Sequence, residues 1–555
     1  MTPWWKFRPA ITPLRLSLSL AVFFLVCLNG AVIARLYAIG RSEAMTPGFI
    51  LSLPVFAVSA FNLLLLPFSG RHTARVVFIP LLLLSAVASY ATCNYGVIFS
   101  KEMIGNIVDT DFEEATSYLN LTAALWFLFL GIVPAGIVSR LDIVPSRRKY
   151  AHPLISACCS LLAICIIAGV YFQDYAMTLR NYPDLKKLVV PTYALASGVK
   201  FARGRYFTSK LPYRDVGIDA RLDHSPGSSR SLTVLVVGET ARADNYSLNG
   251  YERDTNPHTT PLGVVSYRNV TSCGTETAVS VPCMFSGLTR AGYSQDKAAS
   301  QDNALDILKR AGVQLLWIDN NSGCKGVCKN IPTISIRAEY ADRPGLCDSS
   351  GCLDEAFIPE LEKRLKGLKP ENTVIVLHLM GSHGPAYFKR YPRNFGAFKP
   401  DCRQSDVQNC PAQDLVNTYD NTILYTDDVL SRVIQVLQKH QDQWDTSLIY
   451  ASDHGESLGE NGLYLHGLPY GFAPRQQKHV PLIAWFSPSF LQKANLSKRC
   501  IARDADREFS HDNIYHTLLG IAGVRTKAYA PDMDLFAHCR EPKLSGVSTG
   551  LIQFP

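Results

Sequence analysis

The 555 residues of this sequence contain no nucleic-acid recognition motif, no internal repeat and no low-complexity tract. The net charge of +8, from 55 basic and 47 acidic residues, is scattered along the chain. Scattered charge without a recognition motif argues against nucleic acid as a partner, and attraction to anionic lipid explains the positive balance better.

The first apolar stretch, Leu16 to Ile39, lacks the clean small-residue cleavage site that ends a signal peptide. Four more apolar stretches follow it: Gly48 to Phe68, Val76 to Tyr95, Leu119 to Val138 and Leu154 to Phe172. Each approaches the roughly 20 residues that a helix needs to span a bilayer. The sequence therefore predicts a multi-pass membrane helical bundle of five spans over residues 1–172.

The basic residues of the short loops predict the orientation of these spans. Three groups lie before the first span, between the second and third, and between the fourth and fifth: Lys6, Arg8 and Arg15; Arg71 and Arg75; Arg140, Arg147, Arg148 and Lys149. Cytoplasmic placement of these loops puts everything after Phe172 on the far side of the membrane. Residues 173–231 mix aromatic and basic side chains, a pattern typical of short helices in the headgroup layer, and end in the flexible connector Ser225 to Arg230.

The 15 cysteines support an oxidising compartment for the rest of the chain, since ten of them lie beyond residue 270. Short-range pairing is the simplest connectivity: Cys273–Cys283, Cys324–Cys328, Cys347–Cys352 and Cys402–Cys410, leaving Cys500–Cys539. A zinc cluster at Cys324 and Cys328 is the competing interpretation, but the second Cys/His pair that such a cluster requires is missing. We therefore expect the domain beyond the last span to lie in an oxidising compartment such as the periplasm.

Residues 232–555 contain short continuous apolar runs typical of a parallel sheet covered by helices. The runs are Leu232 to Val237, Val313 to Ile318, Thr373 to Leu379, Ser447 to Ala451 and Val480 to Phe486, and helical stretches such as Asn303 to Arg310 and Asp354 to Lys366 lie between them. This alternation predicts one large α/β sandwich.

Polar side chains follow three of these runs. Glu239 follows the first, Asp453 and His454 follow another, and His378 and His383 end a third. Functional groups gather at the carboxyl ends of parallel strands, so we expect these side chains to share one edge of the sheet. A lone His378 on an apolar run is more typical of a supporting histidine than of a metal ligand.

Thr277 lies in a hydroxyl-bearing turn between Cys273 and Cys283, and residues from Ala278 to Gly287 can continue as a helix. A threonine hydroxyl becomes a nucleophile only when a metal or a base removes its proton. Glu239, Asp453, His454 and the Thr277 oxygen make a four-coordinate N/O set suited to Zn²⁺. The simpler interpretations are a disulfide-closed surface loop and an Asp-capped turn at Asp453.

The loop between the third and fourth spans carries Asn106, Thr110 and Glu114 at intervals of four. On a helix these side chains share one face, which would suit a cationic headgroup. Spacing alone favours a solvated loop.

Several motifs together resemble those of the membrane-bound lipid A phosphoethanolamine transferases, which include the mobile colistin-resistance enzymes. The motifs are Glu239-Thr-Ala-Arg-Ala-Asp244, Thr255-Asn-Pro257, the segment from Cys273 to Cys283, Gly381-Ser-His-Gly-Pro385, and Ser452-Asp-His-Gly-Glu-Ser-Leu-Gly-Glu460 with His466-Gly467. The resemblance covers essentially the whole chain. It implies an alkaline-phosphatase/sulfatase-like α/β/α fold for a periplasmic domain anchored in the inner membrane of a Gram-negative bacterium.

The resemblance also implies a ping-pong transfer of phosphoethanolamine from phosphatidylethanolamine to lipid A through Thr277. By matching positions, Glu239, Thr277, Asp453 and His454 would bind zinc, and His383 and His466 would contact the phosphoryl group or a second zinc. His378 would be a nearby supporting residue in the substrate site, and Asn106, Thr110 and Glu114 would bind the donor headgroup. A monomer is expected. Glu276 departs from the small residue usual between the two threonines, with an effect that the sequence does not define.

Other functions remain open at this point. The alternative acceptors are Kdo and core heptose of lipopolysaccharide. A phosphoglycerol transferase would share the spans and the threonine, with manganese instead of zinc and without the paired cysteines. A sulfatase needs Cys or Ser in a Cys/Ser-x-Pro-x-Arg motif, which the sequence lacks. A membrane-anchored zinc sensor without turnover is the alternative outside enzymes.

Overall fold

The computed structural model describes residues 9–42, 45–109, 118–144, 151–182, 184–207, 211–222, 230–348 and 351–541. The chain forms two compact units, one built mainly from residues up to Thr208 and the other mainly from Ser209 onward. The basic loop residues Lys6, Arg8, Arg147, Arg148 and Lys149, and positions 225–229 of the expected connector, lie outside the described residues. The division into residues 1–172, 173–231 and 232–555 stays a prediction.

Four helical segments of the first unit are long and apolar enough to cross a membrane. They are α3 (Pro47–Leu65) continued by η3 (Leu66–Phe68), α4 (Ala74–Tyr95), the run of α7 (Leu121–Phe127), η4 (Leu128–Ile132) and α8 (Val133–Arg140), and α9 (Ala151–Asn181). Among the described residues a fifth candidate is a bent pair, Pro13–Leu28 with Gly30–Arg41, whose two parts meet at 64°. The membrane domain expected from the sequence is confirmed, with its first span broken.

Asn29 lies at the break between η2 (Phe24–Leu28) and α2 (Gly30–Ser42), beyond α1 (Pro13–Phe23). Its side-chain amide donates to the Phe24 carbonyl at 2.8 Å and to the Val190 carbonyl at 2.7 Å, and its oxygen accepts from the Val190 N–H at 2.9 Å. The first bond pairs with a carbonyl beside the break, and the other two pair with both backbone groups of Val190. The Asn29 side chain therefore links the bend to a segment that is distant in sequence.

The remaining elements of the first unit are short. They include β1 (Ala10–Ile11) paired with β2 (Asp142–Ile143), α5 (Lys101–Asp109), η5 (Leu185–Lys187), α10 (Thr192–Ala202) and η6 (Arg203–Phe207). Helix α9 runs past the predicted end of the fifth span at Phe172, with a kink at Tyr171.

A seven-stranded sheet forms the centre of the second unit, in the order β5-β15-β12-β4-β11-β7-β8. Its strands are β4 (Ser231–Gly238), β5 (Val265–Tyr267), β7 (Gln314–Asp319), β8 (Thr333–Ser335), β11 (Thr373–His378), β12 (Asp445–Ser452) and β15 (Leu482–Phe486). Strands β12, β4, β11, β7 and β8 are mutually parallel. Every residue of β4 and β12 is buried, as their continuous apolar runs predict.

The prediction of an all-parallel sheet is wrong at one side. Strand β15 runs antiparallel to β12, and β5 runs antiparallel to β15. A parallel return requires a crossover connection, usually a helix. Between β12 and β15 the chain has only β13 (Ser457–Leu458), η14 (Glu460–Gly462), β14 (Tyr464–Leu465) and η15 (Arg475–Gln477), so it returns in the opposite direction.

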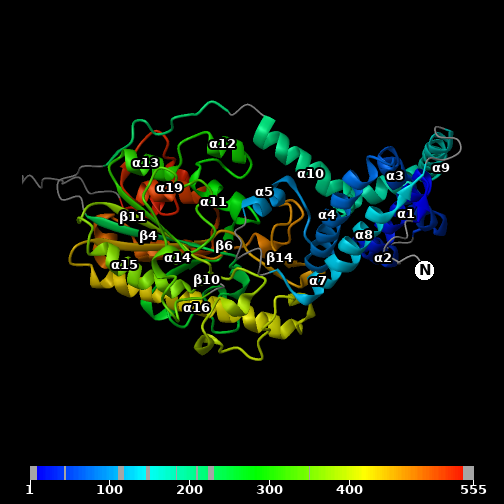
Figure 1. The fold of residues 1–555 in the computed structure, drawn as a ribbon. Coiled ribbons are helices and arrows are strands. Elements are labelled where there is room, and N and C mark those ends of the chain that lie inside the picture. Colours follow the sequence, from blue (N-terminus) through cyan, green and yellow to red (C-terminus); the bar gives the residue numbers. More distant parts are fainter. Residues whose placement is uncertain are drawn as a thin grey trace, which may run out of the picture. The chain divides into compact units, whose positions relative to one another are not determined.

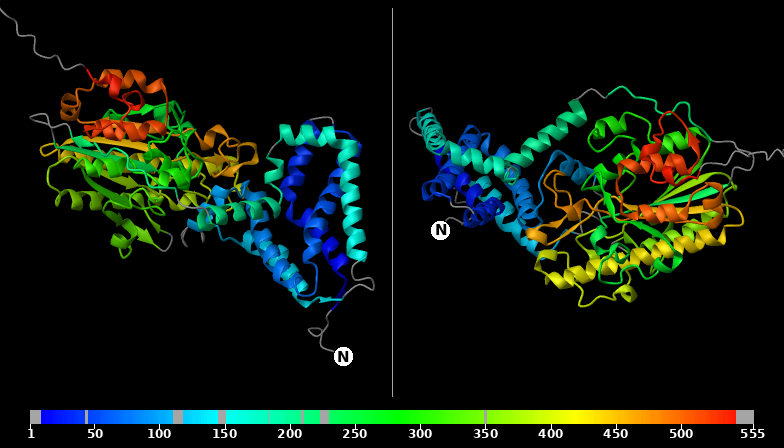
Figure 2. Two further views of the ribbon diagram at one scale, coloured as in Figure 1. Left: turned by 90° about the horizontal axis from the view of Figure 1, so that it is seen from above. Right: turned by 180° about the vertical axis from the view of Figure 1, so that it is seen from behind.

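Helices cover both faces of the sheet (Figures 1 and 2). On one face lie α11 (Thr277–Phe285), α13 (Ala304–Arg310) and α19 (Asp512–Ile521), and on the other lie α15 (Phe357–Leu365) and α16 (Ala412–Lys439). Asn303 caps α13 in a reciprocal capping box with Asp306. The α/β/α layers expected from the sequence are confirmed, although α16, the longest helix of this unit, was not predicted.

Smaller elements complete the second unit. They are β3 (Arg221–Leu222) with β17 (Val524–Arg525), β6 (Asn269–Thr271) with β16 (Glu508–Ser510), β9 (Cys347–Asp348) with β10 (Gly351–Cys352), α12 (Gln295–Ala299), α14 (Ile336–Tyr340), α17 (Pro488–Lys493) and α18 (Lys498–Arg503). All five expected disulfides are present: Cys273–Cys283, Cys324–Cys328, Cys347–Cys352, Cys402–Cys410 and Cys500–Cys539. The Cys324–Cys328 bond excludes a thiolate zinc cluster there.

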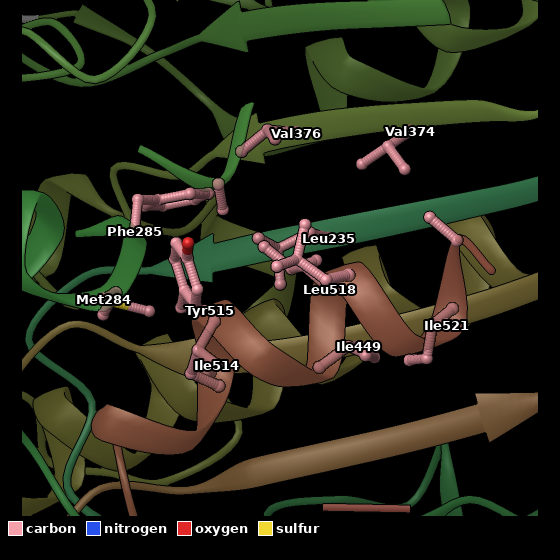
Figure 3. Packing of buried hydrophobic residues seen from close by; sticks show 14 of the residues in the cluster. Leu235, Met284, Phe285, Val374, Val376, Ile449, Ile514, Tyr515, Leu518 and Ile521 are labelled. Atoms are coloured by element: carbon pink, nitrogen blue, oxygen red, sulfur yellow. The ribbon is translucent and has the colours of Figure 1, made fainter. Parts of the chain in front are cut away.

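The main core lies between the sheet and α19 (Figure 3). Leu235 of β4 points toward Leu518 of α19, and both side chains are at most 1% exposed. Replacement of Leu235 by alanine leaves a cavity under α19. The core at this position therefore contributes directly to the stability of the strand that carries Glu239.

We expect Leu235→Ala to lower the free energy of unfolding of the second unit by about 2–5 kcal/mol, because lost burial and the cavity both cost stability. Urea unfolding of the full-length protein in detergent, followed by tryptophan fluorescence, measures the change. The control Leu211→Ala, at a 47% exposed leucine, should stay within about 0.5 kcal/mol of the wild type. Equal effects of the two variants would contradict this account of the core.

Candidate active site

The register of the parallel strands brings the predicted polar residues to one edge. Gly238 of β4 pairs with Ser452 of β12, and His378 of β11 pairs with Val237 on one side and Asp319 of β7 on the other. A carboxylate follows each of these two paired strands directly: Glu239 follows β4 and Asp453 follows β12. Functional side chains at the carboxyl ends of such strands share one crevice.

Thr277 is the first residue of α11 and is 7% exposed. The Cys273–Cys283 disulfide ties the turn before it to the body of the helix. Two hydrogen bonds join the same turn to the segment after His466: the Thr275 hydroxyl donates to the Leu468 carbonyl at 2.6 Å, and the Gly467 N–H donates to the Thr275 carbonyl at 2.8 Å. The turn that carries Thr277 and the segment that follows His466 therefore form one connected structure.

Four side chains that can coordinate a metal ion meet at this point, and Thr277 is one of them. The Thr277 hydroxyl donates to Glu239 Oε2 at 3.0 Å and lies 3.4 Å from His454 Nε2. His454 Nε2 lies 3.3 Å from both Glu239 Oε1 and Asp453 Oδ2. Glu239, Asp453 and His454 are all fully buried. A hydroxyl, an imidazole and two carboxylates thus meet in a dry site.

The donor set fits a divalent cation. Asp453 Oδ1 accepts from the Thr240 and His454 N–H groups at 3.1 and 2.7 Å, whereas the buried Oδ2 accepts no hydrogen bond from the described residues. An unsatisfied buried carboxylate oxygen is costly unless a cation binds it. Ligand atoms of Glu239, His454 and His466 also lie within 4.8 Å of one another.

The electrostatics of the site also show a deficit of positive charge. Burial lowers the pKa of His454, but the charges of Asp453 and Glu239 outweigh it and raise the pKa to about 10. Burial, reinforced by the Glu239 charge, raises the pKa of Asp453 above its ordinary value. Two carboxylates this close in a low dielectric favour any nearby cation, and without a metal the imidazole takes up a proton to serve as one.

His383 and His466 lie beside this cluster. The ring centroid of His466 is 4.3 Å from that of His454 and 5.8 Å from that of His383. His466 Nδ1 lies 3.4 Å from Glu456, whose Oε2 accepts from the Tyr387 hydroxyl at 2.9 Å. Burial raises the pKa of Glu456 to about 8. Two imidazoles therefore lie within reach of a group bound at Thr277.

The structure brings together six of the predicted site residues: Glu239, Thr277, His383, Asp453, His454 and His466. His378 is buried outside the group, with Nδ1 3.4 Å from Asp319 Oδ2 and its ring against Trp317. Asn106 lies on α5 in the first unit, whereas Thr110 and Glu114 lie outside the described residues. The roles of these last three residues stay predictions.

Several residues that contact Glu239 or Glu456 were not predicted from the sequence. Asn321 Nδ2 donates to Glu239 Oε2 at 2.9 Å, and the Thr240 hydroxyl donates to Glu239 Oε1. Asn321 follows β7 by two residues, so the strand-end rule that found Glu239 was a usable signal for it. Tyr387 has no such signal, because it contacts Glu456 only through the tertiary fold.

His511 is the least expected of the missed residues. It is fully buried, its Nδ1 accepts from the Cys273 N–H at 3.1 Å, and its Nε2 donates to the Ser452 carbonyl at 2.9 Å. Burial lowers the pKa of His511 to about 3, so the ring is neutral and keeps one donor and one acceptor. The imidazole therefore joins the loop that carries Thr277 to the strand that carries Asp453.

Comparisons with known proteins agree with this geometry. A sulfatase family model matches residues 231–524, and a model described as phosphoethanolamine transferase EptA/EptB matches residues 57–206. Phosphoethanolamine transferase EptA of Escherichia coli K12 is 39% identical, with 96% of this chain and 98% of that protein covered. Phosphatidylethanolamine transferase Mcr-1 of Escherichia coli is 37% identical, with coverage of 93% and 96%.

A solved structure extends the likeness to the whole fold. The integral membrane protein lipooligosaccharide phosphoethanolamine transferase A of Neisseria meningitidis matches with a TM-score of 0.92 and 34% identity, covering 96% of this chain and 100% of that one. Fold and site together define a membrane-anchored enzyme with a sulfatase-like periplasmic domain. The chain belongs to the phosphoethanolamine transferase family of EptA and Mcr-1. The resemblance seen in the sequence motifs is confirmed.

We expect His511→Leu to lower kcat about 100-fold with little change in KM, because loss of both hydrogen bonds lets the Thr277 loop shift relative to Asp453. His511→Gln keeps a donor and an acceptor and should recover part of this loss. Steady-state kinetics of phosphoethanolamine transfer by both variants, beside their thermal unfolding, separates positioning from stability. A folded His511→Leu protein with unchanged kcat would refute the positioning role.

Proposed function

We propose that the protein transfers phosphoethanolamine from phosphatidylethanolamine to a phosphate of lipid A, through a covalent intermediate on Thr277. The observation that carries the proposal is a buried site in which the Thr277 hydroxyl, Glu239 and Asp453 each lie within 3.4 Å of His454 Nε2. The names of the relatives support phosphoethanolamine as the transferred group.

In the first half-reaction, Thr277 Oγ1 attacks phosphorus and a new P–O bond forms. The bond between phosphorus and the glyceride oxygen breaks, and its electron pair stays on that oxygen. His383 and His466 are placed to supply the proton that completes diacylglycerol. The hydroxyl proton lost by Thr277 balances the proton gained by diacylglycerol.

In the second half-reaction, a phosphate oxygen of the acceptor attacks the same phosphorus. The P–O bond to Thr277 breaks, and Thr277 regains its hydroxyl proton. Microscopic reversibility assigns His383 and His466 the reverse proton transfer in this step. The burial of Thr277 keeps water away from the intermediate, so transfer rather than hydrolysis is favoured.

Glu239, Thr277, Asp453 and His454 would hold Zn²⁺, and His466 lies close enough to join them. When bound, zinc lowers the pKa of the threonine hydroxyl and offsets negative charge on the phosphoryl oxygens. A set of two carboxylates, one imidazole and one hydroxyl suits zinc in number and donor type. One ion accounts for this set, and a second near His383 and His466 is left open.

Both substrates are membrane lipids, as an enzyme with a membrane domain and a periplasmic catalytic domain requires. Asn106, Thr110 and Glu114 are proposed to bind the ethanolammonium group of the donor, with His378 supporting the phosphoryl site, in a monomeric enzyme. Addition of a cationic amine to lipid A reduces its negative charge. Weaker attraction of polymyxins, including colistin, and hence resistance, is the expected consequence.

Thr277→Ala removes the proposed nucleophile and should lower the rate of phosphoethanolamine transfer by a factor of at least about 10³. Mass spectrometry of lipid A from a Gram-negative host expressing either protein measures the product directly. The wild type should add phosphoethanolamine and Thr277→Ala should not, whereas Thr333→Ala, on the outer strand β8, should match the wild type.

Two other results would change the conclusion. Unmodified lipid A together with diacylglycerol release in vitro would keep the half-reaction at Thr277 but assign another acceptor, such as Kdo or core heptose. Absence of diacylglycerol release by the wild type with zinc present would refute the transferase mechanism itself.

Removal of zinc should also destabilise the periplasmic domain, because the binding free energy of the ion is lost and only a proton on His454 then offsets the charges of Glu239 and Asp453. A ligand at about 100 times its Kd adds about 2.7 kcal/mol to stability. Thermal unfolding of the full-length protein with chelator, then with added Zn²⁺, should show a loss and a recovery of several degrees. Asp453→Asn should weaken this response, and an equal response in the variant would contradict the assignment of Asp453 as a ligand.

A further inference from the structure

A small cavity of about 290 Å³ lies next to the active-site loops. Its walls come from the hairpin closed by the Cys347–Cys352 disulfide, from the turns η11 (Tyr387–Lys389) and η12 (Arg393–Phe395), and from Arg403. The volume suits one phosphate with part of a sugar ring, below the size of a whole drug-sized ligand. None of the predicted site residues lines it.

The charge of this cavity is strongly one-sided. Four cationic side chains line it, with Asp348 as the one carboxylate among the lining residues: Lys389, Arg390, Arg393 and Arg403. Arg403 is paired outside the cavity with Asp401 at 2.9 Å. Lys389 and Arg393 are exposed and have no salt bridge with any described residue. A concave site whose lining includes Lys389 and Arg393, without a salt-bridge partner among the described residues, attracts anions and disfavours cations.

The cavity is tied to the phosphoryl-transfer site through one turn. Arg390 Nε donates to the carbonyl of His383 at 2.8 Å. Tyr387, at the start of η11, donates through its hydroxyl to Glu456 beside His466. The segment from Tyr387 to Arg390 thus bonds to Glu456 and to the His383 backbone, and its residues Lys389 and Arg390 also line the cavity.

The donor lipid does not account for this site. Its phosphate is the group that reacts at Thr277, and its remaining headgroup is an ammonium that the cationic lining would repel. The acceptor, by contrast, needs one phosphate at the reacting phosphorus and carries a second phosphate elsewhere. An anion site beside the active site matches that second group. Arginine forks bind phosphate with two parallel hydrogen bonds.

We propose that the cavity lined by Lys389, Arg390, Arg393 and Arg403 binds the second phosphate monoester of the acceptor lipid and so aligns its other phosphate for attack. This inference rests on the proposed function. It identifies an acceptor subsite that is separate from the donor site. The class of ligand is a phosphate monoester attached to a sugar.

The double variant Lys389→Gln/Arg393→Gln tests the subsite, since both side chains are exposed and the fold should tolerate them. Lys366→Gln/Lys369→Gln removes the same charge from exposed positions outside the cavity and serves as the matched control. Full-length proteins in detergent at fixed ionic strength are compared in two assays. The first measures diacylglycerol release, and the second measures transfer to a bisphosphorylated and to a monophosphorylated acceptor.

We expect the cavity variant to release diacylglycerol at the wild-type rate and to show a KM for the bisphosphorylated acceptor raised about tenfold, a change of about 1.4 kcal/mol. The monophosphorylated acceptor should show no such difference. Inorganic phosphate should compete with the bisphosphorylated acceptor in the wild type and much less in the variant.

An unchanged KM for the bisphosphorylated acceptor would overturn the subsite while leaving the proposed function intact. A rise in KM that is equal for both acceptors, or that the control variant shares, would show that surface charge in general attracts the acceptor. That result would also overturn the proposal. A wild-type protein that releases no diacylglycerol would instead overturn the proposed function, and the subsite with it.

Discussion

The parallel pairing of β4 with β12 is the constraint on which the site depends. It places Gly238 opposite Ser452, so Glu239 and Asp453 leave the sheet side by side into a fully buried space. Two like charges in a low dielectric repel strongly. Such an arrangement persists only where a cation is supplied, whether as a proton on His454 or as a metal. The sheet therefore creates an electrostatic demand that the chemistry at Thr277 uses.

Many residues of the sequence motifs hold this arrangement in place through hydrogen bonds and ion pairs. Within Glu239-Thr-Ala-Arg-Ala-Asp244, Arg242 pairs with Glu460, and Asp244 lies 3.0 Å from His479 Nδ1. The Thr255-Asn-Pro257 segment is fixed by Asp427 of α16, which accepts from Asn256 and from the next two backbone N–H groups. Hydrogen bonds to a buried carboxylate stabilise the loop that donates them. Motif residues that never meet the substrate thus set the positions of those that do.

The features predicted correctly from the sequence are those that depend on a local pattern of residues. Glu239, Asp453 and His454 were found because each directly follows an apolar strand, and the disulfides because most partners are close in sequence. The direction of β15 was predicted wrongly, since an apolar run carries no information about direction. The contacts of His511 with Cys273 and of Asn29 with Val190 join residues 238 and 161 positions apart, so only the fold reveals them.

The site residues fall into two groups, according to the part of the fold that fixes their positions. Glu239, Asp453 and His454 leave the ends of central strands, whose ladders fix them directly. Thr277, His383 and His466 lie on connecting segments, and there the fixing comes from the Cys273–Cys283 disulfide, from the bonds between Thr275 and the Gly467–Leu468 backbone, and from Arg390 on His383. The Cys273–Cys283 disulfide, which the oxidising periplasm preserves, therefore helps to keep Thr277 in position beside the groups at the strand ends.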